Sequence, residues 1–534
     1  GRTYFAVGLL SAAALAFEIA LTRLFSITQW YHFAFLAVSV ALLGYGASGT
    51  ALSLVPGWAR PPTAGRASTL AVLFSAAVIG AYLSLNYLPF DSYRIAWERI
   101  QVVYLVLYYL ALTVPFFCAG LVTGLLLVAH PGHTARVYAA NLLGAAVGGL
   151  LPVLALPLVA EGTVLVIAAV GLLAAAAFRF RRGNAMQTSL LLASCGVLLV
   201  VSLNPPALFH LRLSPYKGLS QVLRYPDAQI VWGRWNAFSR VDRVASSSIR
   251  SAPGLSLSYS GQLPVQDGLL VDGDDLSPVN KAGDMAGFTR YLPTALPYLL
   301  RSGGRALVLE PRGGMDVQVA LSQGAESAVA VESNPLLIRA AGPVYADDRV
   351  QTEVDDGRSY ARRSDEVFDV VHLALSDTYR PVTSGAYSLG ERYDLTVEAF
   401  EEYMTRLRPG GLLVVERWLQ LPPSEMLRAG STAVEALHRS GVSEPSGQLA
   451  VLRDWQVGLI LVKNGVLTPD ELVTIRAFAK ARGLDLVALP GLEEEDANQL
   501  NVLEEPFYFR AFRQLLHDPQ ALYASQSYDV RPPT

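Results

Sequence analysis

Cysteine is scarce in this chain: there are two, Cys118 and Cys195, and both lie inside apolar runs. Two such residues provide neither a disulfide framework nor a cysteine-based metal site, and they say nothing about the redox compartment. Histidine is also rare, with seven residues. The pair in HPGH, at 130–133, fits a membrane interface better than a metal site, and His372 is expected to be a hydrogen-bonded core residue. We therefore predict no metal site.

Lysine is absent from the first 204 residues, and acidic residues are almost absent there. This segment has ten arginines and four acids, whereas the rest of the chain carries 32 basic and 41 acidic residues. The contrast predicts a transmembrane domain at 1–204, with the lipid bilayer as its partner, followed by an acidic soluble part. The charge balance does not favour nucleic acid as a partner.

Seven apolar runs in the first segment are long enough, or nearly so, to cross about 30 Å of hydrocarbon. The first is too long for a cleaved signal peptide, lacks a basic leader and is followed at once by the next run. Pro115 predicts a kink in the fourth run, which could also be read as two spans. The seven runs lie near residues 4–28, 31–55, 68–88, 100–129, 136–159, 162–178 and 188–203.

Arginine predicts the orientation across the membrane. With seven spans, Arg94 and Arg99 lie on the same side as the soluble part. The positive-inside rule then places the N-terminus in the cytoplasm and the soluble part outside it, across a bacterial-type inner (plasma) membrane. One span more or less would reverse this orientation. The arginines on the cytoplasmic side are Arg2, Arg60, Arg66, Arg136, Arg179, Arg181 and Arg182.

Four polar residues interrupt the apolar runs: Glu18, Arg23, His32 and Asn141. Such groups are unfavourable at membrane depth unless they face a partner or a cavity. Glu18 and Arg23 are five residues apart and do not share a helical face, so we expect each to contact another helix. Two interpretations stay open: a structural polar clasp with interfacial anchoring, and a substrate path or site facing the soluble part. The motifs GYGASG (44–49) and GAAVGG (144–149) predict close helix packing.

The residue pattern changes after residue 204. Residues 205–300 alternate short apolar stretches with Gly, Pro, Ser and Asp, which predicts a small β-hairpin region. From residue 301 to 534 strands alternate with helices, which predicts a doubly wound, mostly parallel Rossmann-like sheet with ligands at the carboxyl ends of its strands. The segment TPDE at 468–471 predicts a capped helix start. We expect strands at 305–310, 328–332, 350–355, 367–375, 411–417, 455–463 and 484–489.

The turn after the first of these strands is the first part of a candidate ligand site. Gly313 and Gly314 let a ligand approach the backbone, and Asp316 opens the following helix. Glu332 ends the second strand, where it can accept hydrogen bonds from ribose hydroxyls. Asp356 follows the third strand and could accept from an adenine amino group.

Several segments resemble spermidine synthase-like proteins fused to membrane spans. They are SPYKGL (214–219), VDGDD (271–275), YAANLLGAAVGG (138–149), DDGRSY (355–360) and TVEAFEEYMTRLRPGG (396–411). The resemblance implies a class I methyltransferase-type fold with S-adenosylmethionine or its decarboxylated form as ligand. It also implies that cofactor binding involves the turn and the two strand-end acids. The cofactor-binding candidates are Glu310, Gly313, Gly314, Asp316, Glu332, Asp356 and Gly357. The family continues beyond a stretch similar to RPPT, so we expect the natural chain to continue past Thr534.

The chain departs from this family where the chemistry would occur. Glu310, Pro311 and Arg312 replace the first glycines of the family's loop. Ala374 stands where aminopropyltransferases have the acid that deprotonates the amine, and Asp377 alone remains of that pair. We therefore do not expect ordinary spermidine synthesis. Arg312 could hold an anionic group of a ligand, or it could pair with Glu310 and fill the pocket with protein.

The loop at 376–394 lies where related enzymes close over their substrate. Asp377, Tyr379 and Tyr387 are the catalytic candidates, with Arg380 beside them. Long loops are often functional, although this one could instead contact the membrane domain.

Three functions stay open on the sequence alone. The first is a membrane-bound transferase that uses S-adenosylmethionine and an unknown acceptor. The second is a non-catalytic subunit or scaffold of a membrane complex, with protein partners. The third is polyamine aminopropyl transfer. The resemblance also implies a homodimer.

Overall fold

The computed structural model describes residues 1–29, 34–59, 63–92, 94–180, 185–281, 285–376 and 393–534. These residues form two compact units. The first unit comprises residues 1–221, 233–241 and 271–273, and the second comprises residues 222–232, 242–270 and 274–534.

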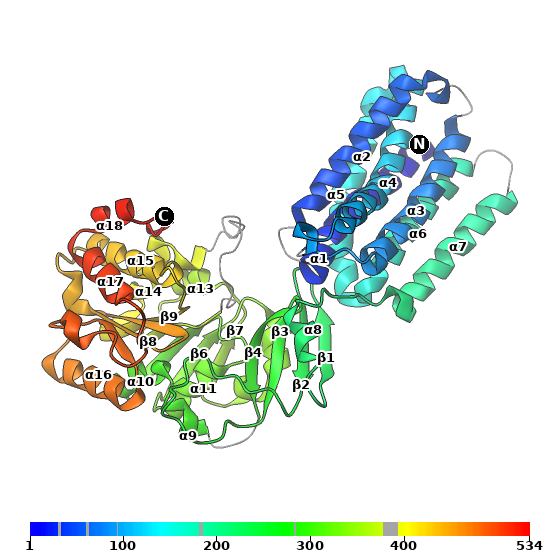
Figure 1. Ribbon diagram of the computed structural model, residues 1–534. Coiled ribbons are helices and arrows are strands. Elements are labelled where there is room, and N and C mark those ends of the chain that lie inside the picture. The colour runs from blue at the N-terminus through cyan, green and yellow to red at the C-terminus, as the bar shows by residue number, and fades with distance from the viewer. Residues whose placement is uncertain (30–33, 60–62, 93, 181–184, 282–284, 377–392) are drawn as a thin grey trace. The chain divides into compact units, whose positions relative to one another are not determined.

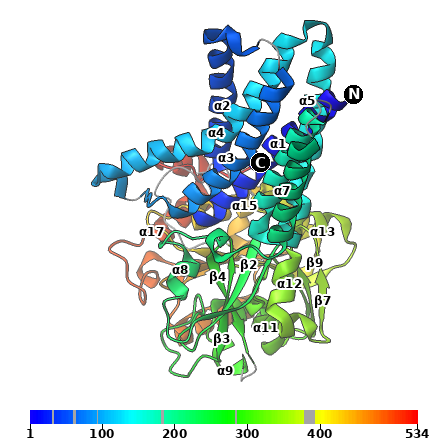
Figure 2. The same ribbon diagram turned by 90° about the vertical axis from the view of Figure 1, so that its right-hand side faces the viewer.

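Seven long helices make up most of the described part of the first unit (Figures 1 and 2). Each coincides closely with one of the predicted apolar runs, and α4 is one helix through Pro115. By length and composition, six segments could cross a membrane, with residues 131–179, which contain α5 and α6, counted as one. The helices are α1 (Arg2–Thr28), α2 (Ala34–Leu54), α3 (Thr63–Tyr87), α4 (Ile100–Ala129), α5 (Thr134–Val159), α6 (Thr163–Arg179) and α7 (Ala185–Leu203).

Glycines bring α1 and α5 into backbone contact. A Cβ atom at Gly144 would lie 2.5 Å from the Cα atom of Gly8, and one at Gly148 would lie 2.5 Å from the Cα atom of Ala12. Either substitution would therefore push the two helices apart. This contact agrees with the packing role predicted for GAAVGG.

The polar residues of this unit form structural contacts. Ser11 of α1 donates a hydrogen bond to Asn141 of α5, at 2.7 Å. Arg23 donates to both carboxylate oxygens of Asp272, at 2.9 Å each. Asp272 lies in a turn between two strands, so the expectation that Arg23 contacts another helix is wrong. Glu18 is partly buried in α1, and His32 lies outside the described residues.

A four-stranded sheet forms within the predicted β-hairpin region, in the order β1-β2-β3-β4. Its residues are divided between the two units. The strands are β1 (Gln229–Trp235), β2 (Arg240–Ala245), β3 (Gln266–Val271) and β4 (Asp274–Asn280).

The second unit is built on an eight-stranded sheet with the order β12-β10-β11-β9-β8-β5-β6-β7. From β7 to β9 neighbouring strands are parallel, whereas β11 runs antiparallel to β9 and β10 antiparallel to β11 and β12. The sheet is therefore mixed. The strands are β5 (Arg305–Leu309), β6 (Ser327–Val331), β7 (Val350–Glu353), β8 (Phe368–Leu373), β9 (Leu407–Trp418), β10 (Leu449–Arg453), β11 (Val457–Lys463) and β12 (Asp485–Ala488).

Helices cover both faces of this sheet (Figure 1). One face shares a continuous apolar core with α13, α14, α15, α17 and α18, and α11 and α16 lie on the other face (Figure 1). The helices from residue 218 onward are α8 (Gly218–Val222), α9 (Met285–Thr289), α10 (Leu296–Leu300), α11 (Met315–Ser322), α12 (Pro335–Ala341), α13 (Gly357–Arg363), α14 (Val397–Thr405), α15 (Glu425–Arg439), α16 (Pro469–Arg482), α17 (Phe507–His517) and α18 (Pro519–Ser525).

The start of α16 is fixed by the predicted capping box. The Thr468 side chain accepts from the Glu471 amide, and the Glu471 carboxylate accepts from the Thr468 amide. Glu471 also pairs with Lys463 and Arg301, both at 2.6 Å. Burial raises the pKa of Glu471, but the hydrogen bonds from these donors outweigh it and lower the pKa to about 2.

Replacement of Glu471 by Gln is expected to lower the stability of the full chain by about 1–2 kcal/mol at pH 7. Because the folded-state pKa lies below the ordinary 4.5, the charged group stabilises the fold above pH 4.5 and loses this effect as pH falls toward 2. Thermal unfolding in detergent at pH 7 and at about pH 2.5 measures the difference. Glu435→Gln, in a partly exposed pair with Arg439, is the control and should change little.

Candidate functional site

The strand order changes direction between β5 and β8, so their carboxyl ends form the crevice where doubly wound sheets bind ligands. The turn after β5 enters this crevice with an unusual backbone. Glu310 and Arg312 have φ angles of 54° and 49°, a region that side chains other than glycine rarely adopt. Glu310, Pro311 and Arg312 thus follow a path that suits glycine.

Glu332, the candidate ribose ligand, is fully buried at the end of β6, with 0% exposure. One of its carboxylate oxygens accepts from the Arg312 amide at 3.0 Å, and the other accepts from the Asn334 amide at 3.1 Å. The turn after β5 therefore supplies one of the donors to this buried carboxylate.

Glu310 lies against Glu332 and is also bonded to protein groups. Its carboxylate accepts from the Ser333 amide at 3.2 Å and from the Ser333 hydroxyl at 3.0 Å. Burial, together with the negative charge of Glu332, raises the pKa of Glu310 to about 9. Burial also raises the pKa of Glu332. The two carboxyl groups therefore hold a proton at neutral pH, in the place where the resemblance puts a ribose.

The other cofactor candidates are also engaged by the protein. Asp356 caps α13, because its carboxylate accepts from the Ser359 amide at 2.9 Å. Gly313 donates to the Ser277 hydroxyl at 3.1 Å, and a Cβ atom on it would collide with the Pro278 carbonyl oxygen. Gly357 begins α13. Gly313 is thus required by protein packing in this structure.

A small cavity lies next to Glu310 at this crevice. Its volume is about 10 Å³, and Glu310, Gly357 and Ala374 are in its lining. A nucleoside does not fit in such a space without movement of the turn after β5.

Arg312 points away from Glu310. Its guanidinium forms an ion pair with Asp275 at 3.7 Å and donates to the Asp275 carbonyl oxygen at 3.3 Å. The alternative in which Arg312 pairs with Glu310 is therefore wrong, although the side chain does lie between protein groups.

A larger cavity of about 300 Å³ lies beside this turn. Carboxylates, one arginine and apolar side chains line it together. The lining includes Asp275, Pro278, Arg312, Asp316, Glu416 and Trp418.

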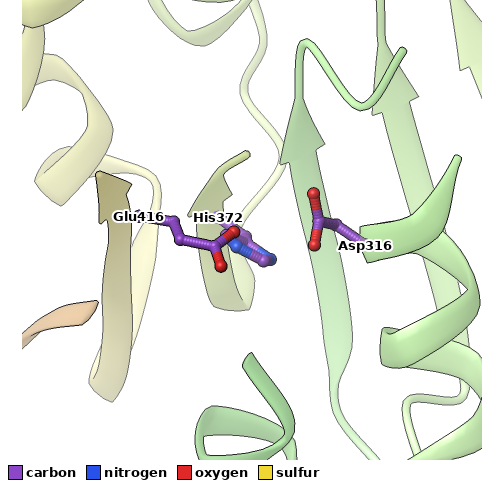
Figure 3. Close-up of side chains that lie close together, drawn as sticks. All are labelled: Asp316, His372 and Glu416. Carbon is purple, nitrogen blue, oxygen red and sulfur yellow. The ribbon is translucent and has the colours of Figure 1, made fainter. Parts of the chain in front are cut away.

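Three titratable side chains lie close together beside this cavity (Figure 3). Asp316 comes from the first turn of α11, His372 from β8 and Glu416 from β9, and their nearest ligand atoms all lie within 4.8 Å of one another. Asp316 and Glu416 line the cavity. On the other side of the ring, His372 Nδ1 is 3.2 Å from the Tyr298 hydroxyl. His372 is thus hydrogen-bonded in the core, as predicted.

Burial determines the protonation of this cluster. It raises the pKa of Asp316 to about 7 and lowers that of His372 to about 3. The pKa of Glu416 is raised well above its ordinary value by burial first, and then by the negative charges of Asp316 and Asp454. The imidazole is therefore neutral, and a second negative charge beside Asp316 is disfavoured.

Sequence reasoning missed this cluster. His372 lies in β8 next to apolar residues, and Glu416 follows the buried apolar run LLVV of β9. Polar residues in such strands were the available signal, because fully buried strands otherwise read as continuous apolar runs. Asp316 was predicted as a charge at a helix start and as a cofactor-binding residue, but not as a neighbour of His372 and Glu416.

The catalytic candidates Asp377, Tyr379 and Tyr387 lie outside the described residues, as does Arg380. Ala374, at the position of the missing amine-activating acid, is buried, and its amide donates to the Leu309 carbonyl oxygen at 3.1 Å. No carboxylate stands at this position.

Comparison with known proteins gave structural similarities only. No family model matches the chain, and no curated protein matches it. A spermidine synthase from Thermotoga maritima is similar over 54% of this chain and 88% of its own, with 15% identity and a TM-score of 0.34. A probable spermidine synthase from Corynebacterium glutamicum is similar over 48% and 86%, with 16% identity and a TM-score of 0.33.

Human methyltransferase-like protein 13, solved in complex with SAH, is similar over 37% of this chain and 88% of its own, with 16% identity and a TM-score of 0.26. Similarities at these scores do not identify the activity of this chain.

Replacement of Glu310 by Gln is expected to stabilise the chain increasingly as pH rises. The folded-state pKa of about 9 lies above the ordinary 4.5, so wild-type stability is fully present below pH 4.5 and declines as pH rises toward 9. We expect equal melting temperatures at pH 4 and a variant that is more stable by about 1 kcal/mol or more at pH 8. Glu326→Gln, at an exposed acid, should show no such trend.

Proposed function

We propose that this chain is an integral membrane protein whose soluble unit has kept a transferase-type fold but has a closed adenosyl site. In this proposal the protein acts as a non-catalytic subunit or scaffold of a membrane complex. This proposal rests mainly on Glu332, which is fully buried and whose two carboxylate oxygens each accept a hydrogen bond from a backbone amide. A carboxylate that is completely buried is out of reach of ribose hydroxyls unless the turn after β5 moves.

The expected orientation supports this proposal. S-adenosylmethionine is a cytoplasmic metabolite, and the arginine distribution places the soluble unit on the other side of the membrane. This orientation counts α5 and α6, which lie in one of the six apolar segments, as two separate spans. Partner proteins in the membrane and a second copy of the chain are the interaction partners that we propose for such a subunit.

A transferase that uses S-adenosylmethionine is the second candidate. It is favoured by the order of groups at the carboxyl ends of three consecutive strands. The turn with Gly313 and Gly314 follows β5, Glu332 follows β6 and Asp356 follows β7. In this candidate the turn has to move and the contact between Glu310 and Glu332 has to break before a nucleoside can bind. Decarboxylated S-adenosylmethionine is the alternative cofactor.

Aminopropyl transfer to a polyamine is disfavoured. An ammonium group has to lose a proton before it can attack, and this needs a positioned base. Ala374 supplies none at the family's position.

Binding of adenosyl ligands separates these proposals. We expect the full chain in detergent to show no thermal shift with S-adenosylmethionine, its decarboxylated analogue or methylthioadenosine, because the ribose position is filled. A soluble spermidine synthase serves as the positive control. Saturable binding by the wild-type chain, abolished by Glu332→Ala, would contradict the non-catalytic proposal and support the transferase.

A gain-of-binding variant tests the physical reason. Glu310→Gly removes the carboxyl group beside Glu332 and suits the φ angle of 54° at this residue. We expect it to gain affinity for methylthioadenosine by about tenfold or more, and Glu310→Gly/Glu332→Ala to lose that gain. Glu326→Gly is the matched control, since that acid is exposed and lies outside the turn.

The side of the membrane can be tested independently. Alkaline phosphatase fused after Thr534 is expected to be active, because seven spans with a cytoplasmic N-terminus put this position outside. A green fluorescent protein fused after Gly132 should fluoresce, since that loop is expected in the cytoplasm. The opposite pair of results would place the soluble unit in the cytoplasm and weaken the non-catalytic proposal.

A further inference from the structure

We propose that Asp316, His372 and Glu416 form a binding site for a divalent transition-metal ion, with Zn²⁺ preferred. One imidazole nitrogen and two carboxylate oxygens are a donor set that Zn²⁺ accepts. The three ligand atoms lie within 4.8 Å of one another (Figure 3).

The imidazole provides an independent observation. His372 is completely buried, with 0% exposure, and its Nε2 atom has no hydrogen-bond partner in the described part of the chain. A buried polar nitrogen normally has a partner, so one without a partner needs an explanation. A bound cation would satisfy Nε2 with its lone pair.

The other ring nitrogen is already oriented for this role. With Nε2 available to a metal ion, Nδ1 carries the proton and can donate it to the Tyr298 oxygen, 3.2 Å away. A histidine that binds a metal generally donates its second ring N–H to a neighbouring acceptor, which fixes the ring and its tautomer.

The two buried carboxylates would be stabilised by a bound cation. Asp316 and Glu416 are 9% and 4% exposed, and they face each other across the cluster. Two buried acids destabilise each other when both are charged. A divalent ion would neutralise both charges at once, whereas a shared proton would neutralise only one.

The three ligand atoms can reach one ion if the carboxylate side chains move toward it. With metal–ligand distances of about 2.0–2.2 Å and tetrahedral coordination, two ligand atoms are roughly 3.4 Å apart. A separation of 4.8 Å therefore has to shrink by about 1.4 Å on metal binding. Asp316 and Glu416 also line the cavity of about 300 Å³. The remaining coordination position would face this cavity, where water or an anionic group of a ligand can occupy it.

The test uses the full chain in detergent, stripped with a chelator, dialysed against ZnCl₂ and analysed for bound metal. We expect one Zn²⁺ per chain, and at least a tenfold loss of affinity in Asp316→Asn and in Glu416→Gln. Co²⁺ replaces Zn²⁺ as a spectroscopic probe, and its visible absorption should change in His372→Gln. Glu495→Gln, at an exposed acid, should bind like the wild type.

Melting temperatures of the metal-free proteins separate loss of the site from loss of the fold. Asp316→Asn and Glu416→Gln each remove a buried charge, so their metal-free forms should melt no lower than the wild type. Zn²⁺ should raise the melting temperature of the wild type only. Less than one-tenth of an equivalent of Zn²⁺ in the wild type, or equal binding by both variants, would overturn the proposal. Binding of Mn²⁺ in preference to Zn²⁺ would overturn the choice of metal.

Discussion

A carboxylate that is buried at the carboxyl end of a parallel strand needs donors, because leaving it without them is strongly unfavourable. At Glu332 the donors are the amides of Arg312 and Asn334. This requirement pulls the turn after β5 onto the end of β6 and holds Arg312 at its φ angle of 49°. The position of Gly313 against Pro278 and the path of Arg312 toward Asp275 accompany this contact.

A second group of buried carboxylates lies at the same edge of the sheet, but its charges are not balanced by backbone donors in the same way. Glu332 finds backbone donors within the protein, whereas Asp316 and Glu416 face a neutral imidazole and a cavity. The contacts of Glu332 therefore fill the space at the end of β6. The negative charges of Asp316 and Glu416 are not balanced by protein donors in this way, and a cation can neutralise them. In both cases acidic residues are buried at this edge of the sheet, and the local donors decide what each acid can do.

In the first unit, polar groups connect segments that are far apart in the sequence. Asn141 contacts α1 through Ser11, and Arg23 pairs with Asp272. Backbone contact between α1 and α5 at Gly8 and Gly144 places these helices too close for larger residues. Of the two interpretations open for these polar residues, the structural clasp describes Arg23 and Asn141 better, since both are engaged in protein contacts.

Patterns with a short period determined most of the secondary structure. Apolar runs marked the seven long helices, and the strands from β5 to β9 lie where the alternation of strands and helices predicts them. The segment TPDE fixed the start of α16, because a capping box is a local interaction. Strand β10 and helix α15 were not predicted, and β11 and β12 were expected without their antiparallel direction, which depends on partners distant in the chain.

Only the tertiary structure decided the site. Asp316, His372 and Glu416 are separated by dozens of residues, and the parallel register of β8 with β9 and the packing of α11 bring them together. Likewise, the sequence placed Glu310 and Arg312 in a turn that usually has glycines, but it did not tell which acid each would contact. Local patterns depend on neighbours within one or two turns of chain, whereas burial and charge pairing depend on which strands lie side by side.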